Sequence, residues 1–314
     1  MSAVPHRRRN ALLRAIAGGA VRVGRFTLPV LKHYSRYGRL MRLHQPIGVW
    51  LLLWPTLWAL WVASDGSPNQ QVFAVLVLGT IIVRSAGCVI NDFADRDIDP
   101  HVRRTARRPL ATGEVTPAEA LVLFVGLMLI ALGLVMTLNG LTVLLACVGA
   151  VLAVLYPFAK RVVSAPQLVL GLAFAWGVPM AFAAQLGGVP REGWLLFVTA
   201  VIWVVIYDTE YAMADREDDL KIGVRSTAIL FGDVDRIVIA GLHALLLLAL
   251  LLVGRSAELG LWYQIGVGVA GGAALYQLYL IKDREPDDCF RAFVNNFWYG
   301  GAIFAGVMLD YALA

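Results

Sequence analysis

The sequence predicts an all-α protein that crosses a membrane about nine times. Hydrophobic residues make up 59% of its 314 residues and only 16% carry a charge, which is rare for a soluble domain of this length. Apolar stretches of about 18–22 residues recur along almost the whole chain, and a helix of that length spans the hydrocarbon core of a bilayer. Basic residues also gather in alternate connections, as they do in polytopic membrane proteins.

The first four expected helices follow a basic N-terminal segment. The first, 46–63, is rich in leucine and tryptophan and ends at the turn-forming stretch SDGSPNQ. The second, 71–90, leads directly into the acidic stretch NDFADRDID. The third, 118–137, begins after TPAE, which fits a capping box with proline at the first helical position. The fourth, 141–158, follows the short connection LNG.

Five further helices complete the expected bundle. The fifth, 166–186, begins at SAPQ, which repeats the capping pattern, and ends at GGVPRE. The sixth, 194–213, leads into a second acidic stretch, DREDD. The seventh, 236–253, ends at GRSAEL. The eighth and ninth, 260–281 and 292–312, are separated by the charged stretch KDREPDD.

Nearly all basic residues fall on one side of the membrane in this arrangement. With the N-terminus inside, 25 of the 27 Lys and Arg residues lie inside, and only Arg191 and Arg255 lie outside. The positive-inside rule therefore places the N-terminus in the cytoplasm. The long charged connections, 91–117 and 214–235, then share the cytoplasmic side, where we expect them to cap an opening.

The first 40 residues form a basic leader, because Asp65 is the first acidic residue of the chain. Arg14 and Arg22 interrupt its apolar stretch, which argues against a secretory signal. We expect residues 1–40 to be disordered or to lie on the membrane surface against anionic lipid, and residues 41–314 to form the transmembrane domain. An organellar transit peptide is the alternative for the leader.

Oxygen-bearing side chains follow the second helix at a regular spacing. Asn91, Asp95 and Asp99 are four residues apart, so a continuing helix would place them within about 80° on one face. Asp97 would point the other way, and we expect Asp92 to be a hydrogen-bonding residue at the helix end. The stretch therefore predicts one column of oxygen ligands.

A second column is predicted after the sixth helix, where Asp208, Asp215 and Asp219 fall within about 40° of one another. Carboxylates near a membrane core are costly unless something pairs with them. The alternative is a solvated loop in which the acids of the first stretch pair with nearby arginines, namely Arg96, Arg103, Arg104, Arg107 and Arg108. We favour two columns that face each other on the cytoplasmic side.

The ligand types favour magnesium. Mg²⁺ prefers oxygen ligands and takes one or two carboxylates together with substrate phosphates. The five histidines and three cysteines are scattered and show no spacing typical of a zinc site or a disulfide framework. We therefore expect the two columns to hold Mg²⁺ against a diphosphate, which the metal makes a good leaving group.

These stretches resemble the UbiA superfamily of intramembrane aromatic prenyltransferases. NDFADRDID fits its NDxxDxxxD motif, and DREDD fits its DxxxD motif. Other stretches are similar to the 4-hydroxybenzoate polyprenyltransferase branch, namely HQPIGVWLLLWPTLWALW, RRPLATGEVT, YPFAKR and YDTEYAMADREDDLKIGVRSTAILFG. The resemblance runs from about Arg39 to the C-terminus.

The resemblance implies a helical bundle around a central cavity with cytoplasmic cap loops. It implies a Mg²⁺-dependent enzyme of ubiquinone biosynthesis that transfers a polyprenyl chain from polyprenyl diphosphate to carbon 3 of 4-hydroxybenzoate. The expected location is the bacterial inner membrane, with the mitochondrial inner membrane as the alternative. Both substrates, membrane lipid and Mg²⁺ are the implied partners, and nucleic acid is not among them.

The resemblance also assigns roles to individual residues. The metal motifs are matched by Asn91, Asp95, Asp99, Asp215 and Asp219, and the four aspartates of this set together with Lys160 are the candidate catalytic residues. Lys160 and Tyr156 match the family's YxxxK element and, with Arg96, would bind the diphosphate. Candidates for the aromatic substrate are Arg161 and Arg42, which could contact its carboxylate, and Asp208.

Two alternatives remain open. The acceptor could be a naphthoate, homogentisate, haem or chlorophyllide. A cation-coupled transporter is the alternative from another class, and it predicts acids or broken helices near the membrane midplane. Here the acids crowd one edge, and Arg84 is the main deeper charge.

Tryptophans and glycines complete the expectations. Five tryptophans are expected at the membrane interfaces, namely Trp54, Trp58, Trp194, Trp262 and Trp298. Four glycines are expected to permit close helix approach, namely Gly126, Gly133, Gly171 and Gly177.

Overall fold

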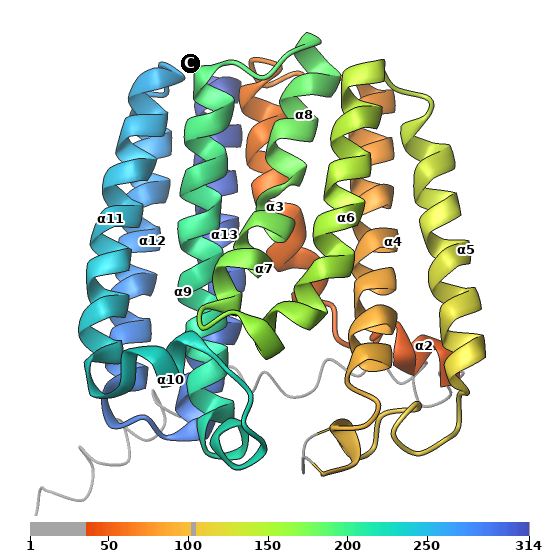
Figure 1. Ribbon diagram of the computed structural model, residues 1–314. Helices are drawn as coiled ribbons and strands as arrows, with labels where there is room; N and C mark the ends of the chain where they lie inside the picture. Colours follow the sequence, from red (N-terminus) through yellow and green to blue (C-terminus); the bar gives the residue numbers. More distant parts are fainter. Residues whose placement is uncertain (1–35, 102–104, 314) are drawn as a thin grey trace, which may run out of the picture.

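The computed structural model describes residues 36–101 and 105–313, which form helices and no strand (Figure 1). The helices are α2 (Arg36–Leu40), α3 (Ile47–Val62), α4 (Gln70–Ala94), α5 (Pro117–Val135), α6 (Gly140–Val162), α7 (Pro166–Ala175), α8 (Gly177–Leu186), α9 (Arg191–Ile222), α10 (Thr227–Phe231), α11 (Asp235–Ser256), α12 (Leu261–Leu280) and α13 (Pro286–Leu313). Short 3₁₀ turns lie at Asp99–His101, Gly232–Val234 and Ile281–Asp283.

The expected membrane-spanning helices are present. In the described part of the chain, eight helical segments are long and apolar enough to cross a membrane, and α3 is a ninth, shorter apolar helix of 16 residues. The fifth span is divided into α7 and α8 at Trp176. Pro179 explains the break, because it has no N–H for the carbonyl of Ala175 and its ring crowds that carbonyl.

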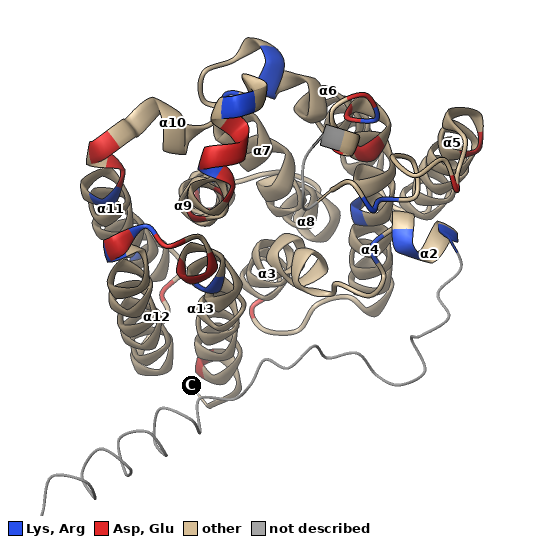
Figure 2. Ribbon diagram, turned by 90° about the horizontal axis from the view of Figure 1, so that it is seen from below, with Lys and Arg blue, Asp and Glu red and all other residues tan. Residues whose placement is uncertain are grey.

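Helix α9 lies at the centre of the bundle, where it packs against α7, α11 and α13 (Figures 1 and 2). In its apolar window 67% of the residues are buried, against 11% in those of α5 and α6. Helices α5 and α6 are therefore the ones that turn most of their apolar side chains outward, as lipid-facing helices do. Because α9 is the most buried of these helices, polar side chains along it are shielded from lipid.

The interface prediction for tryptophan is wrong at two positions. Trp54 and Trp58 are buried in the core, whereas Trp194, Trp262 and Trp298 are exposed. The indole Nε1 of Trp58 donates a hydrogen bond to the carbonyl of Gly300 at 3.0 Å, so its one polar group is satisfied inside the bundle.

Both acidic stretches lie at the same end of the bundle, together with the long connections (Figures 1 and 2). The capping box at Thr116 is confirmed, because Thr116 and Glu119 bond each other's backbone N–H groups. The expected cap by Ser164 is wrong, since Ala165 occupies the N-cap of α7 without a side-chain bond. That this end faces the cytoplasm and caps a central cavity stays a prediction.

The end of the expected leader is ordered. Residues Arg36–Leu40 form α2, and Leu40 is fully buried against a small apolar cluster that includes Val89 and Val115. Residues 1–35 lie outside the described residues, so the prediction for most of the leader stays a prediction.

Candidate active site

Asp95 ends helix α4 and is the centre of the first acidic stretch. It occupies the C-cap of α4, and its backbone N–H bonds the carbonyl of Asn91 at 3.0 Å. The amide Nδ2 of Asn91 donates to Asp95 Oδ2 at 3.3 Å, so these two side chains lie together as expected. The helix does not continue to Asp99, and the expectation of one helical column over all three residues is wrong.

Pro100 limits the helix beyond this point. Helix α4 ends at Ala94, and Pro100 follows in the 3₁₀ turn Asp99–His101. Because Pro100 cannot donate to the carbonyl of Arg96, it prevents the α-helix from resuming through this turn. The backbone of Asp99 still lies next to that of Asp95, because the N–H of Asp99 bonds the carbonyl of Asp95 at 2.8 Å. Its side chain is buried beside the following loop.

The second acidic stretch keeps its helical geometry. Helix α9 runs through to Ile222, so Asp208, Asp215 and Asp219 all lie on one helix, as the spacing predicts. Asp208 lies within electrostatic range of both Asp215 and Asp219. The second column is therefore continuous.

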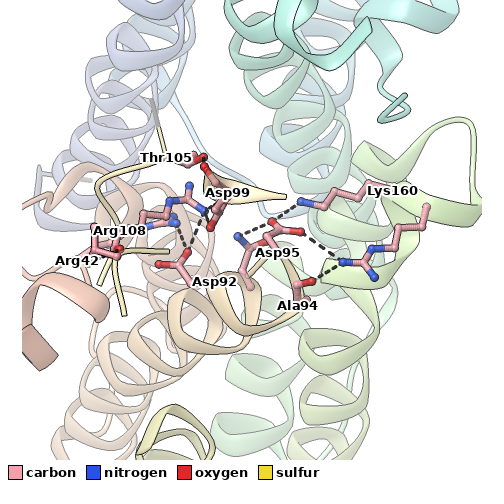
Figure 3. Close-up of polar contacts among 11 residues, drawn as sticks. Arg42, Asp92, Ala94, Asp95, Asp99, Thr105, Arg108 and Lys160 are labelled. Atoms are coloured by element: carbon pink, nitrogen blue, oxygen red, sulfur yellow. Dashed lines mark hydrogen bonds and ion pairs between the residues drawn. The ribbon is translucent and has the colours of Figure 1, made fainter. Parts of the chain in front are cut away.

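The end of helix α6 connects the two stretches. The ammonium Nζ of Lys160 hydrogen-bonds Asp95 Oδ2, and Lys160 also lies within electrostatic range of Asp208 (Figure 3). Tyr156, one turn earlier, lies within electrostatic range of Asp95 and Asp208. A cation and a phenol of α6 thus lie near both an acid of α4 and an acid of α9.

Arg161 lies on the same side of Asp95. It donates to the carbonyl of Ala94, and its guanidinium is 3.9 Å from Asp95 Oδ1. Arg161 also approaches the ring of Phe158 from its own helix, at 6.0 Å from the centroid. Its contacts in this structure are with the end of α4.

Asp92 is a buried carboxylate held between two arginines. Arg42, in the connection from α2 to α3, donates to Asp92 Oδ1 at 2.6 Å, and Arg108, in the α4–α5 connection, lies 3.0 Å from the same oxygen (Figure 3). Burial alone would lower the pKa of the Arg42 guanidinium, but the carboxylate of Asp92 holds that pKa above its ordinary value. Two connections are fixed to the end of α4 in this way.

Arg108 also contacts Asp99, at 2.9 Å and 3.1 Å from its two oxygens. Burial raises the pKa of Asp99 above its ordinary value, and the Arg108 guanidinium only partly opposes this shift. Pairing with a loop arginine, the alternative considered from the sequence, thus occurs for Asp92 and Asp99. The cation on Asp95 comes instead from α6.

Arg96 turns toward its own helix end. It donates to the carbonyl of Phe93 at 2.9 Å, lies over the Phe93 ring at 4.8 Å from the centroid, and is 3.5 Å from Asp97. The expected role of Arg96 at a diphosphate stays a prediction.

Arg84, noted from the sequence as the main deeper charge, lies inside a membrane-length helix. It lies within α4, contacts Cys88 one turn later, and has a buried Nε without a hydrogen-bond partner. A Cβ on Gly48 of α3 would be 2.3 Å from Arg84 Nη2, so the glycine is what admits the guanidinium. Among the described residues, Arg84 forms no ion pair with a carboxylate. The signal for it was a charge inside an apolar helix.

One carboxylate oxygen of the first acidic stretch is free to bind a metal ion. Asp95 Oδ1 is buried and accepts no hydrogen bond, although Arg161 is nearby. Across residues 36–101 and 105–313, no three acidic, histidine or cysteine side chains gather closely enough to surround an ion by themselves. A Mg²⁺ ion bound here would need phosphate oxygens or water to complete its shell.

Comparison with known proteins gives consistent similarities. The model of the UbiA prenyltransferase family matches residues 52–301. The 4-hydroxybenzoate octaprenyltransferase of Nitrosococcus oceani is 57% identical over 278 residues, covering 88% of this chain and 98% of that protein. The protein of the same name from Saccharophagus degradans is 56% identical over 274 residues, covering 87% of this chain and 92% of its own length.

Two solved structures share the fold. A UbiA homolog from Aeropyrum pernix K1 has a TM-score of 0.73 at 23% identity, covering 84% of this chain and 97% of its own. A UbiA homolog from Archaeoglobus fulgidus bound to GPP and Mg²⁺ has a TM-score of 0.68 at 19% identity, covering 86% of this chain and 99% of its own.

Proposed function

Because this chain belongs to the UbiA prenyltransferase family, we propose that it transfers a polyprenyl chain from polyprenyl diphosphate to carbon 3 of 4-hydroxybenzoate and releases pyrophosphate. The substrate names of relatives that are 56% and 57% identical support this acceptor. The observation that carries the proposal is Lys160, which contacts Asp95 of the first motif and lies within electrostatic range of Asp208, on the helix of the second. The product is a precursor for ubiquinone biosynthesis.

The two acidic stretches would hold the diphosphate end of the donor. The residues proposed to bind magnesium are Asn91, Asp95, Asp99, Asp215 and Asp219. When bound, magnesium stabilises the negative charge that develops on the departing pyrophosphate oxygen. Lys160 can donate charge-assisted hydrogen bonds to phosphate oxygens, and we propose Tyr156 and Arg96 as its neighbours in this task. The Archaeoglobus homolog bound to GPP and Mg²⁺ supports a divalent metal and a prenyl diphosphate as the ligands.

The bond changes follow from the chemistry of an allylic diphosphate. The C1–O bond breaks and its electron pair leaves with pyrophosphate, and a ring carbon ortho to the hydroxyl then bonds to C1. Loss of the proton from that carbon restores aromaticity. The chain's tasks are to orient the ring toward C1 and to keep water away from the cation, which a lipid-embedded bundle favours.

The carboxylate of the acceptor needs a cation that is not already neutralised. Arg42 is paired with Asp92, and Arg161 contacts the end of α4. Arg84 lies deeper, without a carboxylate partner among the described residues, and we propose it as a third candidate for the acceptor carboxylate. Asp208 is the candidate that would accept a hydrogen bond from the 4-hydroxyl group.

The location follows in part from the fold. Eight helices long and apolar enough to cross a membrane, in a family of membrane enzymes, make this an integral membrane protein surrounded by lipid. We propose the bacterial inner membrane, with the site on the cytoplasmic side, because the nine-helix topology expected from the sequence assigns 25 of the 27 basic residues to the side of the acidic stretches.

The test is an acceptor assay. Membranes that contain the protein are incubated with Mg²⁺, a radiolabelled polyprenyl diphosphate, and 4-hydroxybenzoate or another aromatic acceptor such as a naphthoate or homogentisate. We expect label to enter the lipid fraction with 4-hydroxybenzoate. Transfer to another acceptor alone would change the assigned substrate, and no transfer to any acceptor would reject the reaction.

A further inference from the structure

A buried polar cluster lies on the side of α9 that faces away from Asp208. Trp203 and Glu210, both fully buried, are seven residues apart on α9, which is about two helical turns. Asn296 of α13, also fully buried, contacts both. Its Oδ1 accepts a hydrogen bond from Trp203 Nε1 at 2.8 Å, and its Nδ2 donates to Glu210 Oε2 at 2.9 Å.

The second oxygen of Glu210 faces another helix. His243 of α11 is buried, and its Nε2 lies 3.9 Å from Glu210 Oε1. A buried carboxylate in a membrane protein is costly unless it is paired, so its partners strongly restrict where Glu210 can lie. Helices α9, α11 and α13 therefore meet at one carboxylate.

The geometry of the amide restricts rotation of α9. The amide of Asn296 accepts from Trp203 through Oδ1 and donates to Glu210 through Nδ2, so it contacts two residues on the same face of α9. The same Nδ2 also donates to the carbonyl of Ala292 on its own helix at 3.2 Å. Side-chain ends lie about 5–6 Å from a helix axis, so a rotation of about 20° would move them by about 2 Å. A shift of this size breaks a hydrogen bond. Only one rotational setting of α9 satisfies both contacts.

The same rotation would move the acids of the second motif. Asp208 is two residues before Glu210, which places it about 200° around the helix. Asp215 and Asp219 follow on the Asp208 face of the same unbroken helix. A rotation of α9 about its axis that moves Trp203 and Glu210 on one face therefore also displaces the carboxylates on the opposite face.

We infer that Asn296 is a positioning residue, which holds Trp203 and Glu210 and thereby aims the acids of α9 at the diphosphate. This inference rests on the proposed function, because it assigns the aim of α9 to Mg²⁺–diphosphate binding. Functional groups must be held to about 0.5 Å, and a misplacement of about 1 Å can cost 100-fold in activity. A contact far from the reacting atoms can thus decide their geometry.

The test exchanges the hydrogen-bond donor and acceptor of the Asn296–Glu210 pair. Asn296→Asp puts a second carboxylate beside Glu210 and removes the donor. Adding Glu210→Gln restores a donor, because the Gln amide can donate to the Asp carboxylate while Trp203 Nε1 still donates to it. Binding of Mg²⁺–pyrophosphate to the full-length purified protein is measured by calorimetry, together with the KM for the prenyl diphosphate and kcat.

We expect Asn296→Asp to weaken Mg²⁺–pyrophosphate binding about tenfold, a free-energy change of about 1.4 kcal/mol, and the double variant to recover most of it. Should Asn296→Asp not yield folded protein, Trp203→Phe removes the Nε1 donor together with part of the buried indole ring, and it is expected to weaken binding in the same direction. Wild-type binding in Asn296→Asp, or no recovery in the double variant, would overturn the inference.

Gln277 provides a matched control. It is a fully buried amide on α12 that donates to Asn295 of α13 at 3.0 Å, and that bond does not involve α9. Gln277→Met is expected to lower thermal stability but to keep Mg²⁺–pyrophosphate affinity. An equal loss of affinity in this control would show a general effect of buried amides and reject positioning by Asn296. If wild-type protein neither binds Mg²⁺–pyrophosphate nor transfers prenyl groups, the proposed function itself fails.

Discussion

The ammonium group of Lys160, at the end of α6, hydrogen-bonds the carboxylate of Asp95, at the end of α4. The contact joins a cation from one helix to a buried acid that has a second oxygen without a hydrogen bond. Lys160 also lies within electrostatic range of Asp208 on α9. A diphosphate bound between these helices would meet a fixed positive charge from α6, which suits the departure of an anion.

Replacing Lys160 by methionine should remove that charge while keeping the apolar stem. We expect kcat to fall about 100-fold, the scale found when one group that stabilises developing negative charge is removed. The measurement is the rate of prenyl transfer with both substrates saturating. Lys221→Met is the control, because Lys221 is exposed and pairs with Asp218. An equal effect of the two substitutions would contradict a special role for Lys160.

Asp95→Ala and Asp215→Ala should each abolish turnover, because each removes a carboxylate from one of the two motifs. Both proteins should still insert into the membrane in normal amounts, since neither change adds a charge to a spanning helix. The measurement is transfer of radiolabel per amount of inserted protein. Asp97→Ala is the control, because Asp97 is exposed and, within the described residues, forms an ion pair with Arg96 alone. Retained turnover in both Asp95→Ala and Asp215→Ala would remove these carboxylates from the site.

Chelation should stop the reaction. Treating the membranes with EDTA is expected to remove activity, and adding Mg²⁺ in excess should restore it, because oxygen ligands on the two stretches bind the metal reversibly. The matched sample receives EDTA already saturated with Mg²⁺. Full activity in EDTA would show that the acids act without a divalent ion.

How far the sequence predicts this site depends on the range of the interactions. The membrane helices and the column on α9 follow from apolar length, charge asymmetry and helical spacing, all of which are local. The sequence prediction extended the helical spacing from Asn91 to Asp99, whereas α4 ends at Ala94. Pro100 excludes a helix that continues past Asp99, but it does not reveal an end as early as Ala94.

Other features depend on contacts between distant segments. Trp58 is buried because its indole finds the carbonyl of Gly300, a partner on another helix that spacing alone does not reveal. Gly177 does permit a close approach, since a Cβ there would be 2.1 Å from Thr56 Oγ1, whereas Gly126 and Gly133 have no neighbour within 4 Å. Glycine within an apolar helix therefore predicts close packing only when the facing helix is known.

Arg84→Gln should raise the KM for 4-hydroxybenzoate. If its guanidinium binds the acceptor carboxylate, loss of this charge-assisted contact should cost about 10-fold or more, whereas the KM for the prenyl diphosphate should stay the same. The measurement compares 4-hydroxybenzoate with 4-hydroxybenzamide, which lacks the negative charge. Wild-type enzyme should prefer the acid, and the variant should lose that preference. Arg255→Gln, at an exposed helix end, serves as the control.

A preference for the acid that survives in Arg84→Gln would return the carboxylate to Arg42 or Arg161. Those two arginines can then be separated by the same comparison. Arg42→Gln would also leave Asp92 with Arg108 alone, so its effect should include a loss of thermal stability.

Asp310→Ala should destabilise the bundle without changing the site. Asp310 of α13 accepts hydrogen bonds from the backbone N–H groups of Gly260 at 2.6 Å, Trp262 at 3.0 Å and Tyr263 at 3.3 Å, which are donors that the start of α12 cannot satisfy within the helix. The carboxylate also lies at the positive end of that helix. Leaving these nearly buried donors unpaired should cost about 1–3 kcal/mol of unfolding free energy. Thermal unfolding in detergent measures the loss, and Asp283→Ala, at an exposed turn, should leave the midpoint unchanged.

Because Asp310 lies at the end of the bundle opposite the acidic stretches, Mg²⁺–pyrophosphate affinity should stay at the wild-type value in folded Asp310→Ala. A large loss of affinity would mean that the cap of α12 is coupled to the site through α13.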